Sequence, residues 1–220
     1  MSSTLQKPQE KNIQYGLADE NRSLRKRLWE RVIDGMMEDD FKREDDPKKD
    51  GPMVFFFAYR ARAYRLKIAF PKNQWHTSDV TLYDSTGLVL IKERMKYQGM
   101  MNHPLLVRFW EIVVEKIVRS GFRKTKHKIG WKLSFSMNGK DYYILIQNAA
   151  AGTAVGDYWG KNFFLHDRGS KKRLLSEFIF NPGESSHPSH PLEELRTLVF
   201  CSTKERRKIR VSNQPLTRFA

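Results

Sequence analysis

The sequence predicts a mixed α+β protein, in which an antiparallel, hairpin-rich sheet packs against one central amphipathic helix and an N-terminal amphipathic helix precedes them. Three observations lead to this class. Apolar residues recur with helical spacing in two stretches, β-rich runs are joined by turn residues in three places, and 40% of the residues are hydrophobic. A chain of 220 residues with this composition can bury a core without disulfides or metals.

Composition divides the chain into four parts. The first part is polar and aperiodic, which is typical of disorder, and Pro47, Gly51 and Pro52 mark a linker further on. We expect a disordered tail at 1–15, an N-terminal amphipathic helix at 16–44, a linker at 45–52, and a basic α+β body at 53–220.

The expected N-terminal helix carries an apolar stripe that includes Leu28, Val32, Met36 and Met37. Its first turns are basic and its last turns acidic, which opposes the helix dipole and makes the isolated helix weak. The stripe must therefore dock on the body or on a second copy of the helix. We expect the second arrangement, a homo-oligomer formed through residues 16–44.

The body begins with strands and contains one well-marked helix. The aromatic run 53–70 predicts one bulged strand or two strands, and hairpins are expected around Asp84–Gly87, Asn138–Gly139 and Asp167–Gly169. Pro104 in the first turn and Gly121 after the end delimit the central helix. A short helix at 191–200 and a last strand at 208–213 complete the expected elements, and the sequence shows no regular repeat.

Positive charge is concentrated in the body. The net charge is +15, yet residues 1–51 hold 11 basic and 12 acidic residues, so 29 basic and 13 acidic residues fall in 52–220. Such a surplus repels itself in a compact fold unless a polyanion neutralises it. The charge therefore favours a nucleic-acid or anionic-lipid partner, whereas the simpler interpretation is a basic protein with solvated charges.

Basic residues gather in four clusters, and aromatic residues lie between them. Tyr158 and Trp159 fall in a glycine-rich stretch with few neighbours to bury them, so we expect them to stack on bases. The candidate nucleic-acid-binding residues are Arg60, Arg62, Arg65, Lys67, Arg123, Lys124, Lys126, Lys128, Tyr158, Trp159, Lys171, Lys172, Arg173, Arg206 and Arg207.

The first two clusters differ in how they would present charge. Alternation along a strand places Arg60 and Arg62 on one face and Arg65 and Lys67 on the other, unless a bulge near Ala63 brings all four together. The alternative is an edge strand whose charges prevent aggregation. The cluster at 123–128 follows a helix end and precedes a strand, so we expect a well-held loop and the best phosphate contact.

Catalytic chemistry is not expected. His187 and His190 have metal-like spacing, but prolines flank His190 and no convincing ligand set accompanies the pair. Glu93 and Lys96 are reminiscent of metal-dependent nucleases, but a spacing of three does not place both on one strand face. We therefore expect no catalytic residue, no metal and no cofactor.

Two functions remain after these exclusions. The first is a non-enzymatic nucleic-acid-binding protein, with single-stranded or structured RNA favoured over sequence-specific DNA, because no helix looks like a reader of the major groove. The alternative is a matrix-type or membrane-surface scaffold that binds anionic lipid through the same basic face. The combination of basic body and N-terminal helix resembles accessory proteins of viruses and mobile elements.

The expected location is intracellular, cytoplasmic and/or nuclear. The single cysteine, Cys201, gives no sign of an oxidising compartment, and the polar start does not have the features of a signal peptide. Basic runs at 22–27 and 204–210 fit nuclear-import patches, a pattern that occurs often by chance.

Overall fold

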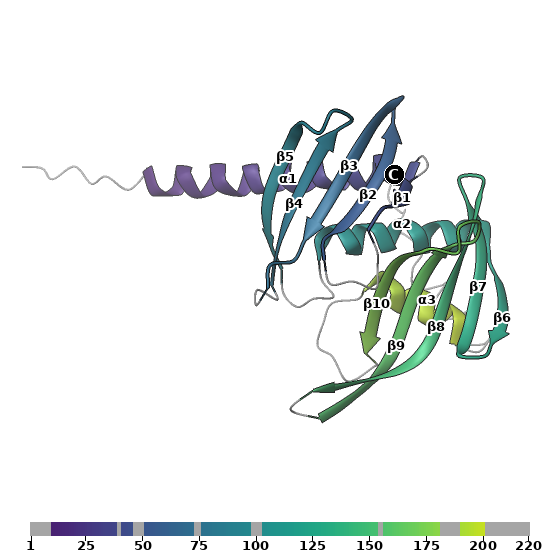
Figure 1. The fold of residues 1–220 in the computed structure, drawn as a ribbon. Helices are drawn as coiled ribbons and strands as arrows, with labels where there is room; N and C mark the ends of the chain where they lie inside the picture. The colour runs from purple at the N-terminus through teal and green to yellow at the C-terminus, as the bar shows by residue number, and fades with distance from the viewer. Residues whose placement is uncertain are drawn as a thin grey trace, which may run out of the picture.

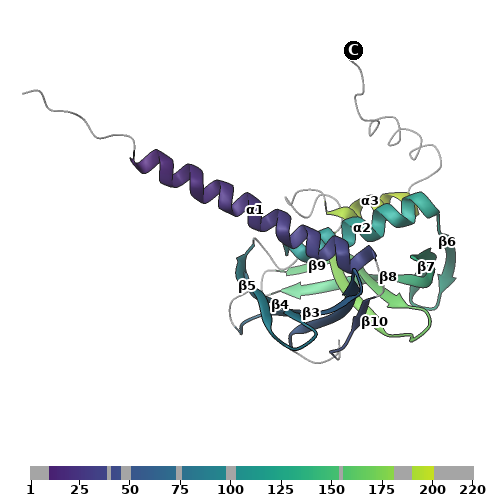
Figure 2. The same cartoon turned by 90° about the horizontal axis from the view of Figure 1, so that it is seen from above.

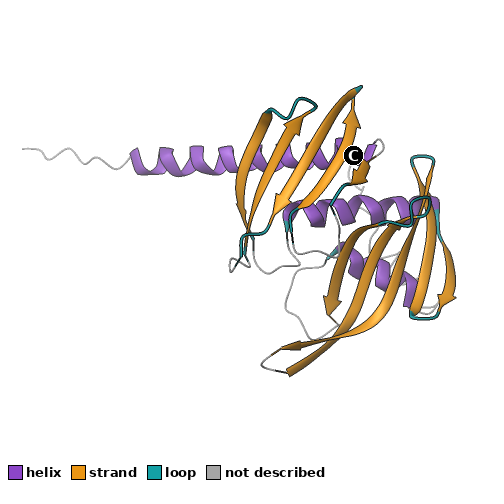
Figure 3. Cartoon of the chain, viewed as in Figure 1, coloured by secondary structure: helices purple, strands orange, loops and turns teal. Residues whose placement is uncertain are grey.

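The computed structural model describes residues 10–38, 41–45, 51–72, 76–97, 103–153, 156–180 and 190–200. The protein belongs to the α+β class, as predicted, and these residues form two antiparallel sheets and three helices (Figures 1 and 3). The expected last strand at 208–213 lies outside the described residues.

The first half of the chain is one helix followed by sheet A, a meander in which each strand pairs with the next. These elements are α1 (Glu10–Glu38), β1 (Phe41–Arg43), β2 (Met53–Tyr59), β3 (Arg62–Ala69), β4 (Thr77–Asp84) and β5 (Val89–Lys96).

The second half repeats this order with a second helix and sheet B, and a third helix closes the chain. Its elements are α2 (Pro104–Ser120), β6 (Arg123–His127), β7 (Gly130–Met137), β8 (Lys140–Thr153), β9 (Gly156–Asp167), β10 (Arg173–Phe180) and α3 (Pro191–Phe200). The expectation of one sheet was wrong. The strands β1–β5 pair in one sheet and the strands β6–β10 pair in a second sheet.

The three helices lie on one side of both sheets, which is clearest when the molecule is seen from above (Figure 2). Helix α2 contacts α1, α3 and β7, while α1 contacts β2. The inner faces of both sheets and the apolar sides of the helices form a single hydrophobic core, with Trp110 and Phe163 among its fully buried side chains. Within the described ranges, no helix therefore lies on the outer face of either sheet.

Helix α1 begins earlier and ends earlier than predicted. Residues 10–15, expected in the disordered tail, are helical, because no residue after Pro8 prevents a helix. At the other end Phe41 is the first residue of strand β1, where it is buried opposite Phe57. Residues 46–50 of the expected linker lie outside the described residues.

The apolar stripe of α1 packs largely on the protein's own body. Met36 and Met37 are 0% and 2% exposed, and Val32 packs against the same core. Only the part of the stripe nearer the N-terminus is open, with Leu28 44% exposed, and the beginning of α1 extends away from the body (Figures 1 and 2). The premise that nothing local covers Met36 and Met37 was therefore wrong.

Turns fix the register of the hairpins. Asn138 and Gly139 have φ values of 52° and 75°, the left-handed conformation of a two-residue hairpin turn, and the Asn138 side-chain amide donates to the Met37 carbonyl at the end of α1. Arg60 and Ala61 also have positive φ values. The β2–β3 register then runs without a shift, so the run 53–70 forms two strands, the second of the two predicted alternatives, without a bulge near Ala63.

The two sheets are joined where the edge strands β1 and β10 meet. The buried Arg43 side chain donates from Nη1 to the Leu174 carbonyl at 2.9 Å, and Lys172 Nζ donates to the Arg43 carbonyl. The Asp45 carboxylate holds the Arg43 guanidinium at 2.7 Å. We call this junction the seam. These hydrogen bonds hold the edge of sheet A next to the edge of sheet B.

Candidate nucleic-acid interface

The outer face of sheet A is basic. Strand alternation and the pairing register place every second residue on this face, while Phe55, Leu66 and Val80 point to the core. The strand residues on the outer face that carry positive charge are Lys42, Arg65, Lys67, Lys92, Arg94 and Lys96.

Aromatic rings lie among these cations. One row across the sheet pairs Lys42 with Phe56, Phe56 with Arg65, and Arg65 with Tyr83. Phe56 is 39% exposed, and the Arg65 guanidinium lies 4.7 Å from the centre of the Tyr83 ring. The row offers cations for phosphate and ring faces for bases side by side.

Asp79 is the acidic strand residue on this face. It forms an ion pair with Arg94, 2.7 Å between Oδ1 and Nε, and this hydrogen bond lowers the pKa of the Asp79 carboxyl. The ion pair leaves Asp79 little free charge with which to repel a phosphate.

A comparable row crosses all five strands of sheet B. Its members pair in order across the sheet: Arg123, Ser134, Tyr143, His166 and Arg173. Tyr143 and His166 stack with ring centres 4.7 Å apart and an interplanar angle of 2°. The row begins and ends with a cation and has two stacked rings at its centre.

A second row next to it adds to this platform. Lys132 Nζ lies 4.3 Å from the centre of the Tyr143 ring, and the Arg173 guanidinium lies 5.0 Å from the centre of Phe164. Burial lowers the pKa of His166, and the positive charges of Arg173 and Lys132 add to that decrease, so the imidazole is neutral near pH 7. A neutral ring can stack on a base and hydrogen-bond to it.

Charge is distributed unequally between the sheets and the helices. Among described strand residues, the two outer faces carry nine cations and two carboxylates. The cations are the six of sheet A together with Arg123, Lys132 and Arg173 of sheet B, and the carboxylates are Asp79 and Asp141. The described side chains of the helices are nearly balanced. Their cations are Arg25, Lys26, Arg27, Arg31, Arg108, Lys116, Arg119 and Arg196, and their carboxylates are Glu30, Asp34, Glu38, Glu111, Glu115, Glu193 and Glu194.

The cluster of basic residues on β3 is divided by the fold. Arg65 and Lys67 lie on the outer face, as described above. Arg60 lies in the β2–β3 turn with its guanidinium 5.1 Å from the centre of the Tyr59 ring, and Arg62 is exposed at the start of β3 with the parity of the inner face. Without a bulge the four side chains do not share one face.

The cluster at 123–128 is a strand, not the loop that we expected. Pairing with β7 makes Arg123–His127 strand β6, although its sequence has no apolar residue to signal a strand. Alternation then separates the candidates: Arg123 lies on the outer face, Lys126 lies opposite Trp131, and Lys128 is exposed in the following turn.

Lys124 has a structural role in this strand. Its Nζ donates to the Val199 carbonyl in α3 at 2.7 Å and lies 4.1 Å from the centre of the Trp131 ring. A cation bonded to one of the last carbonyls of α3 stabilises that helix end. The prediction of Lys124 as a free phosphate contact is therefore not supported by its geometry.

The remaining candidates are placed as follows. Lys171 and Lys172 form the β9–β10 turn, with Lys172 bonded across the seam, and Arg173 lies on the outer face of sheet B. Tyr158 and Trp159 lie in β9, where the side chains are outside the described part of the chain. Arg206 and Arg207 are outside the described residues.

Several outer-face residues were missed by the sequence analysis. They are Lys42, Phe56, Tyr83, Lys92, Arg94, Lys96, Lys132, Tyr143, Phe164 and His166. A signal for three of them exists in the sequence: Lys92, Arg94 and Lys96 alternate with Glu93 and Met95, which in a strand places every cation on one face. The others required the register between strands.

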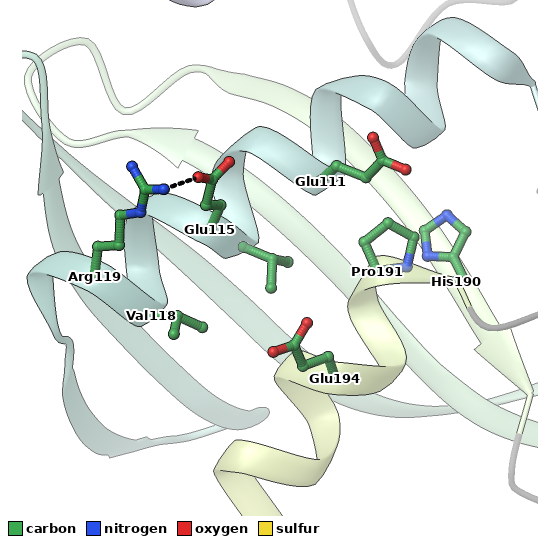
Figure 4. A pocket seen from close by; sticks show the side chains of 8 residues that line it. Glu111, Glu115, Val118, Arg119, His190, Pro191 and Glu194 are labelled. Atoms are coloured by element: carbon green, nitrogen blue, oxygen red, sulfur yellow. Dashed lines mark ion pairs between the residues drawn. The ribbon is translucent and has the colours of Figure 1, made fainter. Parts of the chain in front are cut away.

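The opposite side of the molecule has a groove of about 430 Å³ between α2 and α3 (Figure 4). Glu111, Glu115 and Glu194 lie along it, and Glu115 pairs with Arg119 at 2.6 Å. Burial lowers the pKa of His190, also in the groove, to about 4. The groove therefore presents carboxylates and a neutral imidazole, a poor environment for phosphate. Among the described residues, no three acidic, histidine or cysteine side chains are arranged to hold a metal ion.

The described helices include none with the length and apolarity needed to cross a membrane. No family model matches the chain, and no curated protein or solved structure is found to be similar to it. The fold and the chemistry of its two outer faces are what point to a function.

Proposed function

We propose that this protein is a non-enzymatic nucleic-acid-binding protein that holds single-stranded or structured RNA on the outer faces of its two sheets. The observation that carries the proposal is the combination of nine cations and several partly exposed rings on two faces that none of the described helices covers. Cations neutralise phosphates without reading sequence, and rings stack on unpaired bases.

The surroundings of α2 and α3 favour RNA single strands over sequence-specific duplex DNA. These two helices pack on one another, and the carboxylates of Glu111, Glu115 and Glu194 lie along the groove between them, where they would repel phosphate. A helix that reads the major groove needs a free face rich in polar side chains that reach base edges. The outer-face rings, in contrast, need bases that are not paired in a duplex. Binding is expected to depend on the phosphate backbone and stacking, with little sequence preference.

The proposal is tested with two variants of equal charge. Lys67→Ala with Lys92→Ala removes two outer-face cations, and Arg25→Ala with Arg27→Ala removes two exposed cations from α1. Affinity for a labelled RNA of about 25 nucleotides is measured by fluorescence anisotropy at several salt concentrations. With about 0.7 counterions released per phosphate on a single strand, the sheet variant is expected to lower the log–log salt slope by about 1.4.

The α1 variant is the control that separates a loss of contacts on the sheet from a general effect of net charge. The α1 variant is expected to bind nearly as the parent does, because its charges lie on the other side of the molecule. Equal losses from both variants would mean that only net charge matters. An unchanged affinity in the sheet variant would place the binding surface elsewhere.

A second function, docking on an anionic membrane surface, is favoured by one observation. The β4–β5 turn and the start of β5 expose Leu88, Val89 and Leu90, with Leu88 63% exposed, next to the basic face of sheet A. Apolar anchors beside cations are the chemistry of peripheral lipid binding. Leu88→Gln with Leu90→Gln should abolish sedimentation with phosphatidylserine vesicles and leave RNA affinity unchanged if the surface is used in this way.

Self-association through the N-terminal helix also remains a proposal. The open part of the stripe around Leu28 supports it, because the beginning of α1 extends beyond the body. Such an oligomer would place several basic faces on one RNA, in the cytoplasm or the nucleus.

A further inference from the structure

The two halves of the chain have the same topology. In each half one helix precedes a five-stranded antiparallel meander whose strands pair in sequence order: α1 with β1–β5, and α2 with β6–β10. In each half the helix contacts the second strand of its own sheet, α1 with β2 and α2 with β7. The molecule therefore presents one kind of outer face twice.

The two outer faces carry comparable rows of side chains. In sheet A the row runs from Lys42 on β1 to Tyr83 on β4, and in sheet B it runs from Arg123 on β6 to Arg173 on β10. Both rows contain cations and rings; the Arg65–Tyr83 cation–ring distance is 4.7 Å in sheet A, and in sheet B Lys132 of the neighbouring row lies 4.3 Å from the centre of the Tyr143 ring. The same chemistry thus occurs on both faces.

The two rows approach one another at the seam. Arg43 on β1 bonds to the Leu174 carbonyl on β10, and these residues directly follow Lys42 and Arg173, the outer-face cations at the two edges. Figures 1 and 2 show both sheets on the same side of the helices. Cations are therefore present on both sides of the junction, so a polyanion that crosses it stays near positive charge.

We infer that one single-stranded nucleic acid lies across both sheets and over the seam, so that its ligand is a strand long enough to cover both faces. The inference rests on the proposed function. Strands about 4.8 Å apart make the four-strand row of sheet A about 14 Å long and the five-strand row of sheet B about 19 Å long, or about 34 Å for both rows before the junction is added. At the roughly 3.4 Å per nucleotide of a stacked strand, 34 Å corresponds to about 10 nucleotides, and a stretched strand needs fewer.

Covering both faces changes the affinity and the number of molecules bound. A segment held on one face raises the local concentration of the next segment at the other face, and such linkage increases affinity by about 10²- to 10⁴-fold. A strand that covers only one face lacks this gain, and two such strands fit on one chain.

The test compares uridine oligonucleotides of six and 20 nucleotides, with stoichiometry read by native mass spectrometry and affinity by anisotropy. We expect two six-nucleotide strands per chain, one 20-nucleotide strand per chain, and at least about 100-fold tighter binding of the longer strand. Two long strands per chain, or one short strand per chain at saturation, would overturn the inference. Failure of both lengths to bind would instead refute the proposed function.

Variants of each sheet give a second test that uses only the long strand, so its outcome does not depend on whether the short strand binds measurably. Arg65→Ala with Lys67→Ala affects sheet A, and Lys132→Ala with Arg173→Ala affects sheet B. Each is expected to weaken binding of the long strand at least tenfold. Loss from the variant of one sheet alone would show that the strand occupies that sheet only.

A matched control comes from the same β2–β3 hairpin. Arg60→Ala with Arg62→Ala removes the same charge as the sheet A variant, but from a turn and from the inner-face parity of β3. It is expected to change binding of the long strand less than twofold. A loss equal to that of the sheet A variant would mean that charge alone acts, and would overturn the path across the outer face.

Discussion

The free energy of unfolding of the parent protein is expected to fall between pH 7 and 8.5, and Glu177→Gln is expected to remove most of this fall. Glu177 lies on the inner face of sheet B opposite Phe163, and burial raises the pKa of its carboxyl to about 8, against an opposing hydrogen bond from the Phe178 backbone. The folded protein therefore holds a proton that the unfolded chain, with a pKa near 4.5, has lost. The contribution of Glu177 to the free energy of unfolding is therefore full below pH 4.5 and is lost as pH rises through 8.

The magnitude follows from the difference between the two pKa values. With about 1.4 kcal/mol per pKa unit, the free energy of unfolding falls by at most about 1.3 kcal/mol between pH 7 and 8.5. Because part of the Glu177 surface is accessible, we expect about half of that value. His103 and His190, whose pKa values burial lowers to about 4, act in the opposite direction and mainly below pH 6.5.

The assay is urea unfolding followed by tryptophan fluorescence at both pH values. The Gln variant should show less decrease than the parent, and Glu194→Gln, the same substitution at the rim of the α2–α3 groove, should behave like the parent. Equal decreases in the parent and in Glu177→Gln would refute the argument that this buried carboxyl is protonated.

Three further predictions concern packing and assembly. Gly35→Leu should lower the melting temperature, because even a Cβ at Gly35 meets the Tyr59 ring at 2.9 Å and overpacking costs about 1–3 kcal/mol; an unchanged melting temperature would contradict close packing of α1 on β2. Lys124→Ala should cost about 1 kcal/mol of stability and leave RNA affinity unchanged, whereas Arg123→Ala should do the reverse, and the opposite pattern would exchange their roles. Leu28→Gln should reduce the assembly mass measured by light scattering, and an unchanged mass would place self-association elsewhere.

The elements with strong local signals were predictable from the sequence. Pro104 and Gly121 delimit α2, and the Gly121 N–H bonds to the Ile117 carbonyl at the helix end. Asn138 and Gly139 form the expected turn because both residues tolerate positive φ. In these places the local residue preference and the fold agree.

The arrangement of these elements was not predictable in the same way. Nothing in the sequence separates strands of one sheet from strands of another, so the two sheets and their shared topology emerged only from pairing. Strand β6 lacks apolar residues and exists because β7 provides a partner. The candidate site changed for the same reason. Alternation within known strands decides that Arg123 faces outward and Lys124 faces α3, and runs of basic residues do not contain that information.

The most direct test of the central claim is ultraviolet cross-linking of a uridine oligonucleotide to the protein, followed by mass spectrometry of the peptides. Stacked rings react most readily with the bases that they touch, so cross-links are expected on outer-face residues of both sheets, Phe56 and Tyr83 in sheet A and Tyr143 and Phe164 in sheet B. Cross-links confined to α1, α2 and α3, or to residues 201–220, would contradict the claim that nucleic acid lies on the sheets.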